Sequence, residues 1–261
     1  MFVEPSNAIN WNHAATNGIV AWWKVLPQFW GGNTFRDLLN QNHGTLTNMT
    51  AASDWTGKHG LGGYGSIDLD GSNDFIDCGT TFGWERTQAW TLYCHLNRDV
   101  IDAAHDFFGN FVASTFRGWG MLWAANNKLQ VHLINTWGSN NRIEVDSTSA
   151  DSTLGWVRVG STYDGSSATS GIKIYKNGDA VASTALSHTL SATIVGGGNN
   201  GIGSRDVKSV AEFNGQFGEV LLYDRALSAP EMTQLDKLMV TDYNPMLAWI
   251  DRRSGKKKTA A

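Results

Sequence analysis

At 261 residues the chain is long enough to bury a large core as a single domain, and no stretch of it has the apolar length that a membrane span requires. Its 29 glycines and only 4 prolines suit an all-β architecture, in which many turns connect strands whose interiors exclude proline. With a net charge of −4, the chain is not predicted to bind nucleic acid directly, apart from contacts of a basic tail at its end.

The chain opens with a polar segment, residues 1–17, followed by an apolar run that ends in aromatic residues. The segment has acidic and polar residues where a signal peptide would have lysines and an apolar run, so no secretion signal is predicted. Residues 18–25, GIVAWWKV, form this apolar run, and the segment HGTLTNMT follows at residues 43–50. Trp55 follows in a linker.

Residues 66–79, SIDLDGSNDFIDCG, predict two strands joined by an Asp-Gly-Ser-Asn-Asp turn. Asp68, Asp70, Asn73 and Asp74 also offer hard oxygen ligands of the kind that calcium prefers. The twelve-residue pattern of an EF-hand is missing, and the same residues form a good turn with no ion. A structural calcium ion therefore stays open, and neither a metal site nor any other cofactor is predicted.

Strand periodicity continues through the middle of the chain. In residues 90–96 the apolar side chains alternate with Thr91, Tyr93 and His95, which predicts a half-buried strand with one face in water. Residues 171–175 alternate in the same way, and Asn177-Gly178 then predicts a hairpin turn. Three tryptophans embedded in strands are assigned to the core, namely Trp22, Trp90 and Trp156.

The two cysteines, Cys78 and Cys94, fall on consecutive predicted strands. A disulfide between them requires Cα atoms within about 7 Å of each other. Two small buried thiols are the favoured interpretation, because Cys94 lies on the apolar face of its strand.

Residues 213–235, FNGQFGEVLLYDRALSAPEMTQL, predict a turn, a strand and the start of a helix, in that order. Asn214-Gly215 is a tight-turn dipeptide, and residues 216–223 have the aromatic and aliphatic content of a strand. Ser228 and Glu231 form a capping box, so a short helix is expected over residues 228–239. This is the one convincing helix signal, which argues against a fold of alternating strands and helices.

The ordered series of these segments resembles the laminin-G-like domains of the concanavalin A-like lectin/glucanase superfamily, from about residue 18 to residue 235. The resemblance implies an all-β jelly-roll sandwich of two antiparallel sheets, with one short helix near the C-terminus. It divides the chain into an N-terminal extension, the jelly-roll domain and a C-terminal extension with a basic tail, at residues 1–17, 18–240 and 241–261. The superfamily includes hydrolases, lectins and adhesion modules, so the fold alone does not choose a function.

The chain is predicted not to be an enzyme. Superfamily members that hydrolyse β-glucans use a strand with the spacing Glu-x-Asp-x-x-Glu, which places the carboxylates on one face of a sheet. Glu144 and Asp146 have this spacing, but Ser149 stands where the second glutamate is needed. Glu144 and Asp146 are therefore interpreted as solvent-facing strand residues. The sequence also contains no nucleophile elbow and no metal-ligand spacing among its histidines.

Sugar binding fits the fold and the twelve tryptophans, because exposed aromatic rings stack on the apolar faces of saccharide rings. Trp119, Trp123 and Trp137 cluster in one segment with Asn140 and Asn141, whose amides offer hydrogen bonds. These five are the candidate carbohydrate-binding residues. The alternative is that the three tryptophans belong to the core, where tryptophan is highly buried on average.

The termini indicate a different role. Residues 251–261 carry five basic residues and one acidic residue, which leaves a net charge of −8 on the other 250 residues. An acidic body with a basic tail suggests contact with an acidic surface, and the alternative is a solvated tail. The candidate contacts with other protein subunits are Trp11, Met246, Leu247, Trp249, Arg252 and Arg253.

Two functional hypotheses follow, and neither needs a catalytic residue. In the first, the chain is a structural protein of a virion, such as a phage capsid decoration or fibre component, that docks on other subunits through its terminal extensions and binds surface glycans. In the second, it is a lectin-like carbohydrate-binding module of a secreted or cell-surface protein. The first is preferred, because both extensions lie outside the jelly roll and no signal peptide is predicted.

Overall fold

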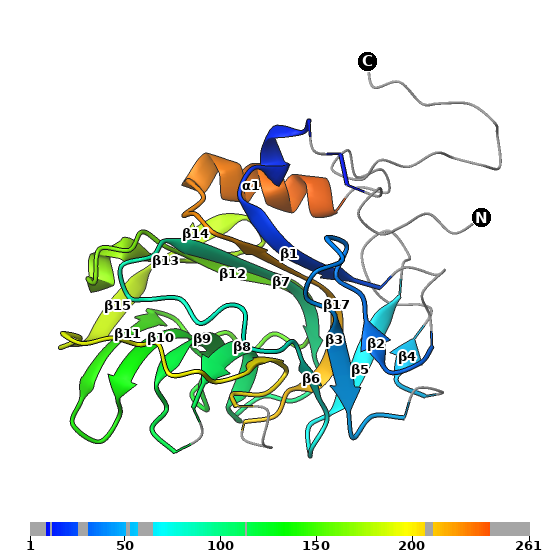
Figure 1. Ribbon diagram of the computed structural model, residues 1–261, viewed down its shortest axis with the longest axis horizontal. Coiled ribbons are helices and arrows are strands. Elements are labelled where there is room, and N and C mark those ends of the chain that lie inside the picture. The colour runs from blue at the N-terminus through cyan, green and yellow to red at the C-terminus, as the bar shows by residue number, and fades with distance from the viewer. Residues whose placement is uncertain are drawn as a thin grey trace.

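A computed structural model describes residues 9–10, 12–25, 31–50, 53–56, 65–112, 114–206 and 211–240 of the protein. In these residues two antiparallel β-sheets pack face to face, and one α-helix lies across the outer face of one sheet (Figure 1). The predicted all-β sandwich with one short helix near the C-terminus is confirmed. Within the described residues, no helix combines the length and apolar character needed to cross a membrane.

The sheet that carries the helix has eight strands. They are β1 (Ile19–Lys24), β4 (Trp55–Thr56), β5 (Ser66–Asp70), β7 (Trp90–Arg98), β12 (Gly155–Tyr163), β13 (Ile172–Lys176), β14 (Asp179–Val181) and β17 (Asn214–Tyr223). Their spatial order is β14-β13-β12-β7-β17-β5-β4, and β1 pairs with the C-terminal half of β17. Because β17 lies between β7 on one side and β5 and β1 on the other, it ties the two halves of this sheet together.

The other sheet has nine strands. They are β2 (Thr34–Phe35), β3 (Gly44–Thr47), β6 (Phe75–Asp77), β8 (His105–Phe111), β9 (Gly118–Trp123), β10 (Leu129–Thr136), β11 (Asn141–Ser147), β15 (Ser183–His188) and β16 (Asn200–Ile202). Their spatial order is β15-β11-β10-β9-β8-β16-β6-β3-β2. The described helices are α1 (Ala229–Met239) and two short 3₁₀ turns, η2 (Ala14–Thr16) and η5 (Thr169–Gly171).

A row of aromatic rings crosses the core between the sheets. The rings of Trp23, Phe108, Trp119, Trp90 and Tyr163 follow one another with centroids 4.5 to 6.0 Å apart. Such spacings are typical of packed aromatic pairs, and each ring buries a large apolar area. The assignment of Trp90 to this core is therefore confirmed, and Trp22 is also wholly buried, in the cluster on the outer face of the eight-stranded sheet.

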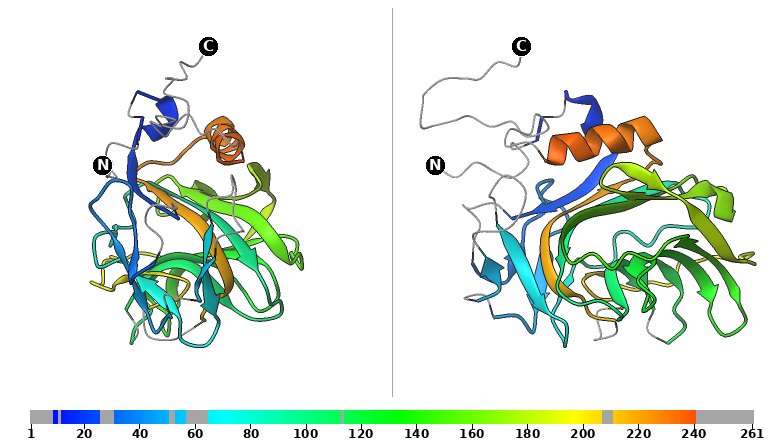
Figure 2. Two further views of the ribbon diagram at one scale, coloured as in Figure 1. Left: turned by 90° about the vertical axis from the view of Figure 1, so that its right-hand side faces the viewer. Right: turned by 180° about the vertical axis from the view of Figure 1, so that it is seen from behind.

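The outer face of the eight-stranded sheet is closed by α1, η2 and residues 37–39, although the sequence predicts a wet face for residues 90–96. Tyr93 donates to Asp236 of α1 at 3.2 Å, and the ring of His95 lies 4.5 Å from that of Trp156. Figure 2 shows η2 and α1 side by side over this sheet. The prediction of a wet face is therefore wrong, and Trp156 is half-buried on this outer face and not in the core between the sheets.

The turns are confirmed in two of three cases. Asn177 and Gly178, with φ of 52° and 82°, form the β13–β14 hairpin, and residues 71–74 connect β5 to β6 in the other sheet. Asn214-Gly215 is not a turn but the start of β17. A glycine is needed there because a Cβ atom at Gly215 would lie 2.1 Å from the carbonyl oxygen of Asn97 on β7.

The C-terminal helix and the thiols agree with the sequence. Glu231 accepts hydrogen bonds from the backbone nitrogen and the hydroxyl of Ser228, both at 2.8 Å. Helix α1 begins at Ala229, directly after Ser228. Cys78 and Cys94 are free and buried, which confirms the interpretation of two small buried thiols.

Candidate functional site

A cavity of about 160 Å³ lies on the outer face of the nine-stranded sheet. This face of the sheet is turned away from α1 (Figure 1). We call the cavity the Trp137 cleft, and it is lined by Phe116, His132, Ile134, Trp137 and Arg205. A site for one water molecule needs about 10 to 15 Å³. The cleft is therefore large enough for a ring-sized group.

Strand alternation places the floor of the cleft. On β10, Leu129, Val131 and Leu133 enter the core, so Gln130, His132 and Ile134 must lie on the outer face. His132 pairs with Gly120 of β9, and Ile134 pairs with Gly118. A Cβ atom at Gly120 would lie 2.6 Å from the ring of Phe111 of β8, so the glycine makes room for that ring beside the floor. Side chains from the flanking loops form the walls.

Trp137 forms one wall, from the turn between β10 and β11. Its side chain is 40% exposed, while the guanidinium of Arg142 covers it at 4.0 Å from the ring centroid. The rings of His132 and Phe116 lie 5.6 and 6.2 Å from the indole ring. This arrangement holds the indole in place while leaving part of it open to a ligand.

A buried row of polar residues runs beside the cleft on β10 and β11. Gln130 donates to Glu144 at 3.0 Å and to Asp146 at 2.5 Å, and Arg142 Nε donates to Glu144 Oε2 at 2.9 Å. His132 Nε2 lies 3.7 Å from Glu144 Oε1, which is too long for a hydrogen bond. Glu144 and Asp146 are only 8% and 2% exposed, so their interpretation as solvent-facing residues is wrong. Their neighbours on the same face cover them.

Burial and partners shift the pKa values of this row in opposite directions. Contacts of Glu144 with the His132 ring and then with Arg142 lower the pKa of its carboxyl to about 2, against the effect of burial. Burial lowers the pKa of His132 and raises that of Asp146. At neutral pH, Glu144 is therefore ionised and His132 is neutral.

The depressed pKa of Glu144 predicts a loss of stability in acid. Its carboxylate stabilises the fold fully above the ordinary pKa of 4.5, and this contribution disappears as the pH falls through about 2. The loss amounts to at most about 3 kcal/mol and is reduced by solvent near the surface. In urea unfolding between pH 6 and pH 2, Glu144→Gln is expected to lose less stability than the parent chain. Equal losses in the two proteins would contradict this role.

Arg205 also lines the cleft, with its guanidinium 5.9 Å from the ring centroid of Phe116. Its Nη2 lies 3.2 Å from Oδ2 of Asp106, a residue of β8 with no exposed surface. Burial raises the pKa of Asp106 to about 7, although the charge of Arg205 opposes this shift. Asp106 therefore anchors Arg205 from below and does not itself reach the cleft.

The five predicted carbohydrate-binding residues have three different positions. Trp137 lines the cleft, whereas Trp119 and Trp123 are wholly buried on the core face of β9, so neither can offer a stacking surface. Asn140 lies in the turn after Trp137, and Asn141 is the first residue of β11; neither lines the cleft. Their side chains bond within the protein, to Ser187 and Ser191.

Of the candidate assembly contacts, Trp11, Met246, Leu247, Trp249, Arg252 and Arg253 all lie outside the described residues. Sequence reasoning also missed Phe116, His132, Ile134 and Arg205. The alternation of Gln130 and His132 with apolar residues could have indicated a polar outer face on β10. Phe116 and Arg205 stand in separate loops, and no sequence spacing connects them.

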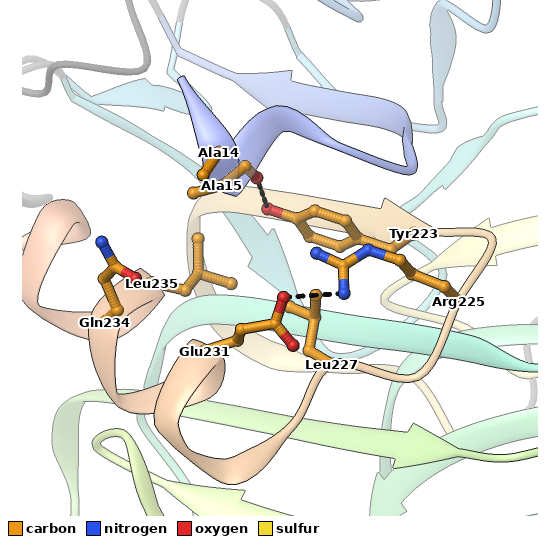
Figure 3. Close-up of a pocket in the computed structure, with 8 residues that line it drawn as sticks. All are labelled: Ala14, Ala15, Tyr223, Arg225, Leu227, Glu231, Gln234 and Leu235. Carbon is orange, nitrogen blue, oxygen red and sulfur yellow. Dashed lines mark hydrogen bonds and ion pairs between the residues drawn. The ribbon is translucent and has the colours of Figure 1, made fainter. Parts of the chain in front are cut away.

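Two other cavities are less suited to a ligand. One, of about 70 Å³, lies between η2, β17 and α1, and Figure 3 shows the residues that line it. There Tyr223 donates to the Ala15 carbonyl at 3.0 Å, and Arg225 pairs with Glu231 at 2.8 Å. A larger one of about 270 Å³ contains the Lys176–Asp151 ion pair, also at 2.8 Å. In both cavities the charged side chains pair with each other, and none of the described lining residues is an exposed aromatic residue.

Metal binding finds no support in the described part of the chain. No three or more His, Cys, Asp or Glu side chains there lie together as a metal site requires. In the turn after β5, Asp70 Oδ1 accepts from the backbone of Ser72 at 2.8 Å, and Asp74 Oδ2 accepts from the backbone of Asp70 at 3.1 Å. These carboxylates therefore act as turn-forming residues.

The sequence also matches a known family. Residues 70–233 match the family described as the concanavalin A-like lectin/glucanases superfamily, which is more than half of the chain. The chain belongs to this superfamily. Its two antiparallel sheets and single helix are the fold that the resemblance implied. A search of curated proteins found no match.

Solved structures that share the fold of this chain include sialidases and a CBM40 domain. One is a Trypanosoma rangeli sialidase in complex with sialic acid, at 13% identity and a TM-score of 0.59, covering 89% of this chain and 36% of the sialidase. Another is the Ruminococcus gnavus IT-sialidase CBM40, at 14% identity and a TM-score of 0.50, covering 66% of this chain and 96% of that domain. The chain thus spans about a third of the sialidases it matches, and at such identities the likeness concerns the fold alone.

Proposed function

We propose that this chain is a non-catalytic carbohydrate-binding module that holds a saccharide in the Trp137 cleft. The observation that carries the proposal is the indole of Trp137, 40% exposed at the edge of a cavity with apolar and polar walls. An indole offers a flat apolar surface for the C–H face of a sugar ring, and the nitrogens of His132 and Arg205 supply polar contacts beside it.

Membership in a superfamily of lectins and glucanases supports this proposal. So does the CBM40 domain, which shares the fold and has been solved bound to α2,3-sialyllactose. The eight-stranded sheet is closed by α1 and η2, which leaves the outer face of the nine-stranded sheet as the broad face for a ligand.

A binding role fits the carboxyl groups of this region better than hydrolysis does. A general acid works best with a pKa near the working pH, but the pKa of Glu144 is about 2. Asp106 has a pKa of about 7, yet it is buried beneath Arg205. Ser149 lies beyond the end of β11, so it does not extend the carboxylate row of that strand.

A glycan array tests the proposal. The full chain, labelled at one terminus, is applied in calcium and in chelator, and selective retention on a subset of glycans is expected in both. Retention on no glycan under either condition would contradict a carbohydrate-binding role. Retention only in calcium would contradict the metal-free cleft as the binding site.

We propose a separate role for the terminal extensions, which is to attach the protein to a larger assembly such as a virion. The alternative location is the cell surface or the extracellular space. The charge contrast between the basic residues 251–261 and the acidic remainder supports this role. Deletion of residues 244–261 is expected to leave a folded protein that binds glycans but no longer joins its assembly. Normal incorporation of the truncated chain into purified particles would contradict the proposal.

A further inference from the structure

Two buried nitrogen atoms on the walls of the Trp137 cleft have no hydrogen-bond partner. They are His132 Nε2 and Arg205 Nε, and His132 is only 4% exposed. Buried polar atoms in proteins are nearly always hydrogen-bonded, and leaving one unpaired is costly. Two such atoms on the walls of one cavity indicate a ligand that brings acceptors.

The charges around the cleft are layered. Glu144 stands behind His132 and Arg142, and Asp106 lies beneath Arg205, while none of the described residues that line the cavity is a carboxylate. His132 and Arg205 thus each have a carboxylate of the protein nearby, while His132 Nε2 and Arg205 Nε have no hydrogen-bond partner. A guanidinium is a fork of donors whose geometry matches a carboxylate, and its hydrogen bonds to an anion are stronger than those to a neutral oxygen.

We infer that the cleft selects an acidic saccharide, whose carboxylate accepts from Arg205 and His132 while its ring rests on Trp137. The inference rests on the proposed carbohydrate-binding function of the same cleft and adds the class of sugar. His132 is neutral at pH 7, so it acts as a donor in the tautomer that carries its proton on Nε2. Ile134 and Phe116 complete the apolar side of the cleft.

Paired ligands that differ only in charge provide the test. Tri-galacturonic acid is compared with its methyl ester, and α2,3-sialyllactose with the methyl ester of its sialic acid carboxyl, by isothermal titration at low and physiological salt. In at least one pair the acidic member is expected to bind about tenfold or more tightly than its partner. This preference should shrink as salt is added.

Variants of the Arg205–Asp106 ion pair test whether the preference for the acidic ligand arises in the cleft. Arg205→Gln together with Asp106→Asn removes both charges without leaving one of them buried alone, and it is expected to weaken binding of the acidic member more than that of its neutral partner, so that the preference is lost. The matched control is Arg158→Gln with Asp236→Asn, a similar pair at 2.6 Å between β12 and α1, which should keep the preference. Circular dichroism of each variant confirms that it is folded.

The outcomes separate this inference from the proposed function. Equal binding of acidic and neutral partners, with loss of both in Trp137→Ala, would overturn the acidic-sugar inference and leave the carbohydrate-binding function standing. A preference that survives in the Arg205→Gln, Asp106→Asn variant would overturn the inference as well. No binding of any of the four saccharides, joined by an empty glycan array, would overturn both.

Discussion

Trp137→Ala is expected to weaken saccharide binding by at least about tenfold, the effect typical of a central aromatic residue at a binding site. The substitution removes the exposed indole that forms one wall of the cleft, while Arg142 keeps its hydrogen bond to Glu144. The free energy of unfolding should fall by less than about 1 kcal/mol, because the main contact that the substitution removes is the one between the indole and Arg142. Titration calorimetry with a glycan retained on the array measures the effect.

Two companion variants make this result specific. Trp137→Phe keeps a smaller aromatic surface and is expected to lie between the parent chain and Trp137→Ala. Leu154→Ala removes a side chain that is 54% exposed in the loop between β11 and β12, and it should leave the affinity unchanged. Equal affinities of the parent chain and Trp137→Ala would place the saccharide elsewhere on the molecule.

Lys24→Met is expected to destabilise the fold by about 3 to 5 kcal/mol, the cost of leaving one partner of a buried ion pair alone. Lys24 Nζ lies 2.8 Å from Glu219 Oε2, and the two side chains are only 5% and 1% exposed. Trp22 Nε1 also donates to this carboxylate, at 3.1 Å. Without Lys24, the carboxylate of Glu219 remains buried, and Trp22 is its one side-chain donor among the residues that the structure describes.

Chemical denaturation measures this loss against a matched pair. Lys176→Met breaks an ion pair with Asp151 of the same length, but there the two side chains are 27% and 12% exposed, so a cost of about 1 kcal/mol or less is expected. Adding Glu219→Gln to Lys24→Met should recover part of the loss. Similar losses of unfolding free energy in the two single variants would show that the outer face of the eight-stranded sheet is open to water. The Trp137 cleft would then no longer be the evident binding site.

Much of the fold can be predicted from the sequence, because local signals determine it. The capping box of Ser228 and Glu231 and the Asn177-Gly178 turn lie where they are expected. The errors arise where distant segments meet. The dipeptide Asn214-Gly215 suggests a tight turn, but Gly215 is required for close contact with β7. Tyr93 and His95 suggest a wet face, but α1 and Trp156 cover them from more than 60 residues away in sequence.

The site is less predictable, since composition does not distinguish core tryptophans from exposed ones. Trp119, Trp123 and Trp137 are near one another in sequence, yet β9 turns the first two inward and only the turn after β10 exposes the third. Arg205 reaches the cleft from a loop about 70 residues further along the chain. Its position depends on Asp106 of β8, a contact that no spacing in the sequence reveals.

The central claim, that a saccharide occupies the Trp137 cleft, is tested most directly by nuclear magnetic resonance of the ¹⁵N-labelled protein during titration with a retained glycan. We predict that the indole N–H of Trp137 and the amides of Gly118 and Gly120 shift with the binding curve, while the indole N–H signals of Trp22 and Trp156 on the other sheet stay in place. A saturable binding curve that leaves the Trp137 signal unmoved would contradict the claim.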